Sequence, residues 1–523
     1  MGKYFLILAF LGIEFAVVLN VLVPNQDNAK DLDLLKAKYS KEEKQPADHS
    51  KFAALNKHFD RPEDVTLACI SCHNERDKQI MATNHWTWEK TEYMKGKGIV
   101  NFGKINAINN FCVSIKGNEG SCVKCHAGFG LGKPEFSLND SAKVDCLICH
   151  DNSETYMKGQ DMNGFPDPKV DLTKVAQNVG KPERSNCGVC HFYGGGGNNV
   201  KHGDLEEALF EPNKDLDVHM AVDQVNMQCV DCHKTIDHKI KGNLYSVSSM
   251  DLNRLTCDEC HSATPHKEDI LNEHTLKVAC QTCHIPTYAK ANATKLEWDW
   301  STAGRLRNGE PYEIDDKDGN HTYLSIKGSF KWGKNLQPDY AWFNGTANHY
   351  LMGEVVKDTT QPVQINTLYG SYSDVNSKII PIKIHKGNQP YDPINRILIT
   401  PKLYADKKGE GALWVDFDWQ KSAEVGMKET GLPYSGKVGF IKTEAYWPLN
   451  HMVAPKEKSV SCTECHTNSN SRLANLKDFY MPARDRSPFI EDFGLAFIAL
   501  AFGGSLVHGG ARIISKSKNN KKG

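Results

Sequence analysis

The stretch from Cys69 to His284 repeats one five-residue pattern, Cys-x-x-Cys-His, seven times, and an eighth copy follows far downstream. The copies, numbered below as the first to the eighth motif, are CISCH at 69–73, CVKCH at 122–126, CLICH at 146–150, CGVCH at 187–191, CVDCH at 229–233, CDECH at 257–261, CQTCH at 280–284 and CTECH at 462–466. In c-type haem attachment, two thiols bond to the porphyrin vinyl groups and the adjacent histidine ligates the iron. The repeats therefore predict eight covalently bound haem c groups.

Other uses of paired cysteines fit the repeats less well. Structural zinc needs four ligands and does not require a histidine after every second cysteine. Eight closely spaced pairs would also make a poor disulfide framework. The predicted haem-binding cysteines are Cys69, Cys72, Cys122, Cys125, Cys146, Cys149, Cys187, Cys190, Cys229, Cys232, Cys257, Cys260, Cys280, Cys283, Cys462 and Cys465. The predicted proximal iron ligands are His73, His126, His150, His191, His233, His261, His284 and His466.

Composition agrees with a core filled by porphyrin. The 523 residues have a mean hydropathy of −0.51, and few long apolar runs are needed where haem supplies apolar bulk. A formal charge of −1 gives no reason to expect nucleic acid as a partner. We expect a mainly α multihaem cytochrome c with extensive coil, a haem-poor α/β-mixed excursion, and hydrophobic helices at both ends. Covalent haem is attached outside the cytoplasm, so the bulk of the chain is expected to be periplasmic or otherwise extracytoplasmic.

The chain divides into six expected segments. They are 1–24, an N-terminal membrane anchor or uncleaved signal; 25–50, a linker; 51–295, a seven-haem core; 296–455, a haem-poor aromatic-rich region; 456–490, the eighth-haem segment; and 491–523, a C-terminal membrane helix with a basic tail. The apolar run at 4–23 is long enough to span a bilayer. Lysine and arginine after the apolar run at 493–507 favour a cytoplasmic C-terminus and a membrane-anchored protein.

Thirteen histidines lie outside the motifs and could close the second axial face of the haems. Seven of them lie near a motif and are the predicted distal ligands: His85, His202, His219, His238, His266, His274 and His451. His49 and His58 precede the first motif, and His321, His349, His385 and His508 are remote from any motif. Thirteen histidines could close all eight haems, so the count alone does not require an open one.

Several local strings, together with the order of the eight motifs, resemble the octahaem tetrathionate reductase family. The strings are ADHSKF at 47–52, NHWTW at 84–88, INNFCV at 108–113, CVKCHAGFG at 122–130, CGVCHFYGGGG at 187–197, VKHGDL at 200–205, VACQTCHIP at 278–286 and NHMVAP at 450–455. The resemblance covers about residues 45–480 and neither terminal hydrophobic segment. It implies an active-site haem at the second motif with a lysine contributing ligation.

The site residues implied by this resemblance are Cys112 and a lysine near the second motif. Cys112 is the one cysteine outside the motifs, and the family places a lone thiol at its active site. Lys133, seven residues after His126, is the predicted lysine, with Lys124 and Lys143 as alternatives. Taken without the resemblance, the sequence favours Cys112 as a small buried apolar residue over a reactive thiol beside a haem.

The predicted function is reduction of a small anionic or nitrogenous substrate, namely tetrathionate, nitrite or hydroxylamine, by electrons that pass along the haems. Redox partner proteins, either a quinol dehydrogenase or other cytochromes, are the expected donors. The alternative is a membrane-tethered electron conduit in which every haem is closed and no substrate binds. Oxidation of hydroxylamine or hydrazine is a third possibility, but no pattern identifies the cross-linked tyrosine that such enzymes use.

Overall fold

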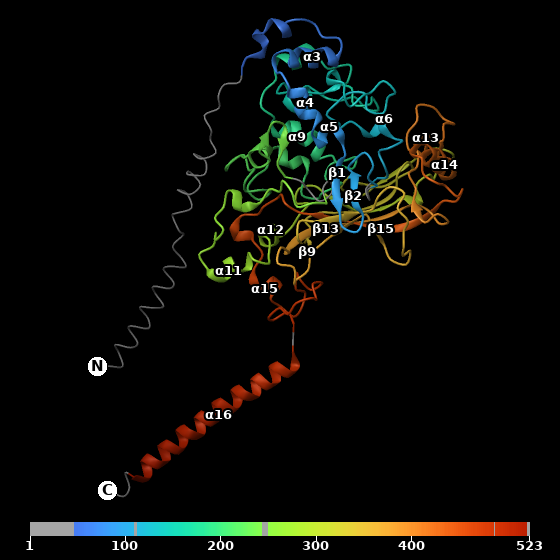
Figure 1. Cartoon of the computed structure of the whole chain (residues 1–523). Coiled ribbons are helices and arrows are strands. Elements are labelled where there is room, and N and C mark those ends of the chain that lie inside the picture. Colours follow the sequence, from blue (N-terminus) through green and yellow to red (C-terminus); the bar gives the residue numbers. More distant parts are fainter. Residues whose placement is uncertain (1–46, 109–111, 243–248, 486, 520–523) are drawn as a thin grey trace.

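The computed structural model describes residues 47–108, 112–242, 249–485 and 487–519 (Figure 1). The expected anchor at 1–24 and nearly all of the expected linker at 25–50 lie outside these residues. The body is built from short helices that carry the motifs and one large sheet that crosses beneath them (Figure 1).

Most motifs form part of a single helical turn. The elements concerned are α3 (Pro62–Cys72), α6 (Glu119–Cys122), α7 (Leu147–His150), α9 (Arg184–His191), α10 (Cys229–Cys232), η5 (Cys257–Glu259), α12 (Cys280–His284) and α15 (Cys462–Cys465). On such a turn, residues three and four apart lie on the same face. The two cysteines and the histidine of one motif can therefore reach a single porphyrin.

The region that the sequence marks as haem-poor contains the main sheet. Its centre is the long strand β13 (Lys378–Asp392), which pairs antiparallel with β15 (Gly439–Pro448) and parallel with β5 (Thr294–Asp299). The strand order in the described chain is β11-β15-β13-β5-β8-β7-β6, with β9 and β14 also paired to β13. The outer strands are β6 (Glu313–Asp315), β7 (His321–Leu324), β8 (Gly328–Gly333), β9 (Asp339–Phe343), β11 (Val363–Gln364) and β14 (Ile397–Leu398).

The expected mainly α architecture is not confirmed, because this nine-stranded sheet is the largest regular element of the described chain. Alternation in the runs at 321–332 and 378–385 correctly predicts strands, which the structure shows as β7, β8 and the first half of β13. The run at 395–404 forms only the two-residue strand β14. Aromatic residues pack on the sheet, with Trp298 and Trp300 stacked 4.9 Å apart.

Shorter elements complete the body. They are α4 (Arg76–Met81), α5 (Asn84–Thr87), α8 (Leu172–Gln177), α11 (Asp269–His274), α13 (Leu413–Asp416), α14 (Trp419–Thr430), β1 (Lys90–Met94), β2 (Gly98–Phe102), β3 (Thr235–Ile236), β4 (Lys239–Ile240), β10 (Ala347–His349) and β12 (Asn366–Leu368), with 3-10 turns η1 (His49–Lys51), η2 (Ala53–Leu55), η3 (Ser141–Lys143), η4 (Glu207–Phe210), η6 (Trp300–Thr302) and η7 (Lys456–Lys458). Of these, α5 carries His85, α11 carries His274 and β2 carries Ile99.

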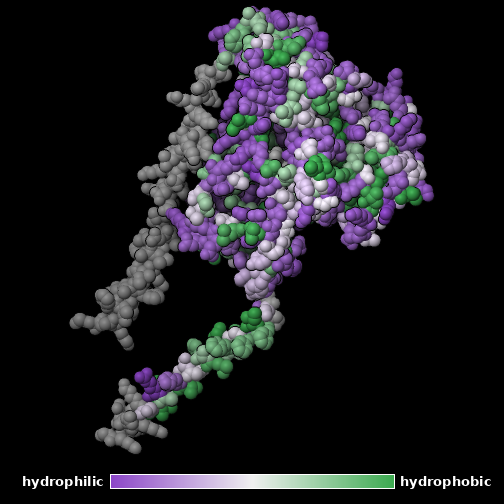
Figure 2. Space-filling view, viewed as in Figure 1, coloured by the Kyte–Doolittle hydropathy of each residue, from purple (hydrophilic) through white to green (hydrophobic). Residues whose placement is uncertain are grey.

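A single long helix, α16 (Pro488–Asn519), extends away from the body (Figure 1). Its stretch Phe489–Ser515 is long and apolar enough to cross a membrane, and none of its most apolar window is buried against the protein. Figure 2 shows hydrophobic side chains along most of this helix, in contrast to the largely hydrophilic surface of the body. The structure thus agrees with an apolar C-terminal helix.

Candidate functional site

Seven of the motif histidines face a second histidine at nearly constant separation. The pairs and their ring-centre distances are His73 with His49 (6.2 Å), His191 with His85 (6.2 Å), His150 with His238 (6.5 Å), His261 with His219 (6.0 Å), His233 with His451 (6.3 Å), His284 with His266 (6.2 Å) and His466 with His274 (6.2 Å). Two iron–nitrogen bonds of about 2 Å, plus the distance from each ring centre to its nitrogen, add to about 6 Å. The spacing therefore fits one iron between each pair of rings.

The orientation of these imidazoles supports the same assignment. Seven of the paired histidines use Nδ1 for a hydrogen bond, for example His150 to the carbonyl of Gly180 and His274 to the carbonyl of Ile270. The other five are His49, His233, His238, His451 and His466. A hydrogen bond at Nδ1 fixes the ring and leaves Nε2 as the basic nitrogen that binds metal.

Six of the seven predicted distal histidines occur in these pairs, and His202 does not. The ring of His202 instead lies 5.2 Å from that of Trp447, in an edge-on contact. Its place is taken by His49, which the sequence alone gave no reason to prefer. A histidine from any part of the chain can lie opposite a motif histidine in the folded protein, so closeness in sequence to a motif does not by itself identify the pairs.

The second motif differs from the other seven. Within the described residues, the rings that flank His126 are Trp86 and Trp88, both at 5.2 Å, and Phe136 at 5.8 Å. His126 Nε2 donates to the carbonyl of Trp86 at 2.7 Å, whereas its buried Nδ1 has no hydrogen-bond partner. This reverses the pattern of the paired histidines, because the nitrogen that would bind iron is already occupied.

The lysines predicted for this site lie apart from His126 or are already paired. Lys133 is exposed and lies over the ring of Phe165. Lys124 is also exposed, and Lys143 forms an ion pair with Glu63 at 2.9 Å. Lys158, which the sequence did not suggest, is buried and pairs with Asp145 at 3.0 Å while donating to the carbonyl of His126.

Lys201 is a half-buried lysine close enough to Cys125 of the second motif to interact with its thiol electrostatically. Burial lowers the pKa of Lys201 to about 7, helped by the positive charge of Lys104, while Cys125 of the second motif acts in the opposite direction. A lysine can bind a metal only as the neutral amine, and burial favours that form. Lys201 lies within the string at 200–205 that carried part of the family resemblance, so a sequence signal for it existed.

One face of strand β13 holds the segments that carry Lys201 and Cys112. The buried ammonium of Lys383 donates to the carbonyls of Val200 and Lys201, at 2.9 and 3.0 Å, and to Thr294 Oγ1 at 2.6 Å. Six residues along the same strand, Gln389 donates to the carbonyl of Cys112 at 2.8 Å. Residues two apart on a strand share a face, so Lys383 and Gln389 point to the same side of the sheet.

Cys112 is half-buried next to the second motif. Burial raises the pKa of its thiol, and the ammonium groups of Lys327 and Lys295 act against that rise. Cys112 also lies close enough to Cys122 to contribute to the raised pKa of that thiol, where Lys327 again acts in the opposite direction. The Cys112 thiol and the side chain of Lys327 therefore lie near a haem-attachment cysteine.

The motifs follow one another through space in a continuous series. Thiols of neighbouring motifs are in hydrogen-bond contact at Cys69–Cys146, Cys125–Cys190, Cys187–Cys229 and Cys257–Cys280. Thiols interact electrostatically at Cys149–Cys187, Cys232–Cys260 and Cys283–Cys462. Together these contacts join the motifs in the order eighth, seventh, sixth, fifth, fourth and second, with the third and first branching from the fourth.

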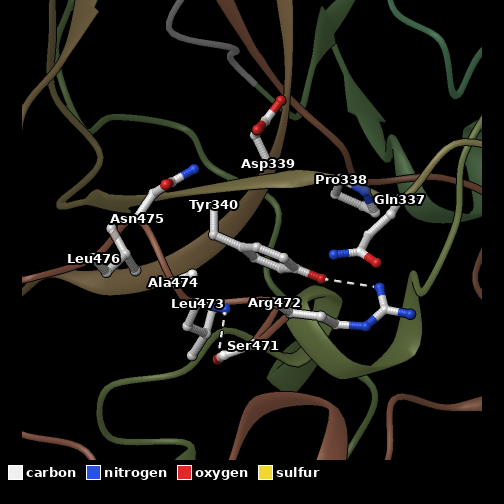
Figure 3. A pocket seen from close by; sticks show the side chains of 10 residues that line it. All are labelled: Gln337, Pro338, Asp339, Tyr340, Ser471, Arg472, Leu473, Ala474, Asn475 and Leu476. Atoms are coloured by element: carbon white, nitrogen blue, oxygen red, sulfur yellow. Dashed lines mark hydrogen bonds between the residues drawn. The ribbon is translucent and has the colours of Figure 1, made fainter. Parts of the chain in front are cut away.

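A small polar cavity lies beside the eighth motif, away from Cys112. Its volume is about 140 Å³, and Figure 3 shows Tyr340 and Arg472 facing each other across it. Arg472 also pairs with Glu464 of the eighth motif, at 2.6 Å. The cavity is therefore part of the framework that holds α15.

Comparison with known proteins identifies the class. A family model described as bacterial cytochrome c matches residues 295–469. The crystal structure of an octahaem cytochrome c from Shewanella oneidensis is similar with a TM-score of 0.77 and 43% sequence identity, over 84% of this chain and 98% of that chain. An uncharacterised protein of Archaeoglobus fulgidus is 26% identical, over 34% of this chain and 74% of its own length.

The chain belongs to the multihaem c-type cytochromes and binds haem c covalently. It shares its fold with an octahaem member of that class. The paired histidines beside the Cys-x-x-Cys-His turns fit this cofactor without rearrangement of the rings.

Proposed function

We propose that this protein is a membrane-anchored octahaem reductase of small oxidised sulfur or nitrogen compounds, and that its substrate binds at the second motif. The observation that supports it best is the arrangement of His126. Seven motif histidines have a histidine opposite them, while His126 directs Nε2 to a backbone carbonyl. Iron with histidine on both faces offers substrate no site, so the second motif is the place where a substrate could bind.

The sixteen motif cysteines hold the eight haem c groups, and the seven histidine pairs close seven of the irons. At the second motif Lys201, rather than the predicted Lys133, would supply an amine ligand in place of His126, whose Nε2 donates to the carbonyl of Trp86, so that this iron keeps a site for substrate. Lys383 positions the Lys201 segment through the carbonyls of Val200 and Lys201. Gly203 permits this approach, because its φ is 88° and a Cβ there would lie 2.7 Å from the ring of Tyr288. Haem c, when bound, would supply one-electron transfer and an iron at which substrate could bind.

Positive charge near Cys112 suits an anionic substrate. Lys295 is almost fully buried, and burial holds its pKa well below the usual 10.5; its Nζ lies 3.5 Å from the ring centre of Phe330 and 4.0 Å from that of Trp298. Lys327 and Lys104 supply cationic groups around the same thiol and the second motif. In a site shielded from water, such groups attract anions and stabilise negative charge that develops on a leaving sulfur or oxygen.

Tetrathionate matches this chemistry. Two electrons break its central S–S bond and give two thiosulfates, so negative charge grows on both sulfur atoms as they separate. Lys327 would stabilise that charge, Lys295 Nζ would donate a hydrogen bond to it, and Cys112 would contact the sulfur chain. Nitrite and hydroxylamine are smaller ligands that the same site would accept.

The series of motifs supplies the route for electrons, and α16 supplies the anchor. The eighth motif lies at one end of the series, next to the start of α16, and the second motif lies near the other end (Figure 1). The basic residues that follow the apolar part of α16 favour a cytoplasmic C-terminus, with the haem-binding body outside. Redox partners at the membrane would be the electron donors.

The test is electron paramagnetic resonance of the oxidised protein, with and without tetrathionate or nitrite, followed by turnover with reduced methyl viologen. We expect one haem signal of eight to respond to the added anion, together with oxidation of the dye. Eight unresponsive low-spin haems and no turnover would instead support an electron conduit without a substrate of its own.

A further inference from the structure

The base of the body, near the start of α16, is held by polar contacts of buried groups up to Asp485. The guanidinium of Arg484 is buried and donates to the carbonyls of Leu473, Leu476 and Phe479. Asp485 accepts from the backbone N–H of Met481 and pairs with Arg484. Pro488, the first residue of α16, follows Asp485 by three positions, and three chain steps span at most about 10 Å.

The eighth motif is fixed to this same base. Arg472 pairs with Glu464 inside the motif and donates to Tyr340 Oη at 3.3 Å, as Figure 3 shows from the cavity side. Cys465 packs against a cluster of buried side chains that includes Leu473 and Met481. The haem attached here therefore stands at a short and fixed distance from the start of the apolar helix.

Exposed apolar side chains surround this motif. They are Ile270 (61% exposed), Leu276 (69%), Tyr372 (50%), Val375 (82%) and Tyr480 (65%), and we call them the basal surface. The segments that carry them are in contact, because Lys277 donates to the carbonyls of Tyr372 and Asp374, and the ring of Tyr372 stacks on that of Phe479 at 5.4 Å. Aromatic and aliphatic groups of this kind are typical of protein surfaces at the level of lipid headgroups.

The helix itself determines what lies below the basal surface. Phe489–Ser515 comprises 27 residues, or about 40 Å at 1.5 Å per residue, which exceeds the roughly 30 Å hydrocarbon core of a bilayer. Its first two turns carry the acidic residues Glu491 and Asp492, so the uninterrupted apolar run begins at Phe493. Hydrocarbon therefore starts within the first two turns of α16, and a connection this short leaves no room for a soluble domain between the body and the membrane.

We propose that the basal surface rests on the outer face of the lipid bilayer, and that lipid-soluble hydroquinone delivers electrons there to the haem held by Cys462, Cys465, His466 and His274. This inference deepens the proposed function and rests on its membrane anchor. One hydroquinone gives one quinone, two electrons and two protons. The electrons pass to the eighth and seventh motifs and onward along the series, while the protons leave to the aqueous side.

The experiment uses the full-length protein in phosphatidylcholine–phosphatidylglycerol vesicles that contain menaquinol-4. The first measurement is the anaerobic rate of haem reduction, followed by absorbance with no substrate present. We expect His274→Met to slow reduction of the remaining haems at least tenfold, because the first group to accept electrons is altered. His49→Met, at the first motif in the opposite part of the body (Figure 1), is expected to change that rate less than twofold. Equal rates in the two variants would overturn the proposal.

The second measurement tests contact with lipid independently of electron transfer. Benzoylphenylalanine placed at Val375 is expected to cross-link to lipid, and the same group at Ile99, 78% exposed on β2, is expected not to do so. A double variant of the basal surface, Leu276→Glu with Val375→Glu, should reduce menaquinol-driven haem reduction at least tenfold. Ile99→Glu is the matched control for an added charge.

Turnover of tetrathionate with reduced methyl viologen in detergent separates the two proposals. This dye reaches exposed haems without a membrane. If the wild-type protein shows no dye-driven turnover, the proposed reductase activity is wrong, and the vesicle assay alone decides whether hydroquinone is the electron donor. The hydroquinone proposal alone would be overturned by a different pair of results. These are normal dye-driven turnover and wild-type haems that menaquinol reduces only after another membrane protein is added.

Discussion

Replacing Lys201 by methionine tests the proposed ligand at the second motif. The pKa of Lys201 is about 7 instead of the usual 10.5, because the side chain is buried near Lys104. With that value the amine is neutral in roughly one tenth of molecules at pH 6 and nine tenths at pH 8. An iron-bound amine must be neutral, so ligation is lost as pH falls through a midpoint at or below about 7.

The assay is electron paramagnetic resonance and absorbance of the oxidised protein between about pH 5.5 and 9, without substrate. Wild type should show one haem whose spectrum changes through that midpoint with the uptake of one proton. Lys201→Met and Lys201→Arg should both lack the transition, since thioether sulfur does not titrate and a guanidinium keeps its charge. If Lys201→Met carries eight haems by mass spectrometry and still shows the wild-type transition, Lys201 is not the ligand.

Three further predictions concern the surroundings of this site. Lys383→Met should lower turnover at least tenfold and shift the same haem signal, because Lys201 loses the group that holds its backbone. Lys386→Met, at an exposed position on the same strand, should leave turnover and the haem signal unchanged. Equal effects of the two variants would show a general defect of β13. Cys112→Ser should reduce tetrathionate turnover at least tenfold without slowing haem reduction by dithionite, and wild-type kinetics would reduce Cys112 to a packing residue. His49→Met should alter one low-spin haem signal and raise the reduction potential of that haem. His202→Met should alter none of the seven paired haems. The opposite result in a redox titration would show that His202, and not His49, is the ligand.

The sequence predicts the haem-attachment residues because that chemistry is local. Two cysteines and a histidine on one helical turn need nothing from the rest of the fold, and the pentapeptide contains all three. Distal ligation is different, since His238 reaches His150 and His451 reaches His233 only after the chain has folded. Closeness in sequence gave six of the seven partners, yet it favoured His202 over His49.

The extent of the sheet was harder to predict for a related reason. Alternation marks β7, β8 and the start of β13, but strands β5, β9 and β15 become one sheet only through pairings between distant segments. Composition, dominated by the haem motifs, pointed to helices. Nothing in the local pattern indicates that fifteen residues from Lys378 to Asp392 form a single strand at the centre of the molecule.

That central strand explains how a chain can hold one haem differently from seven others. A closed haem needs only two histidines, and seven of the fourteen paired histidines have Nδ1 held by a hydrogen bond to a nearby carbonyl or side chain. The second motif needs a buried amine, a thiol and several cations placed together, and buried cations are unstable unless a rigid framework satisfies them. Strand β13 supplies that framework, because Lys383 holds the Lys201 segment and Gln389 holds Cys112 from one face of the sheet. The sheet is therefore best understood as the support of the reactive site, and the short helices as the support of the electron path.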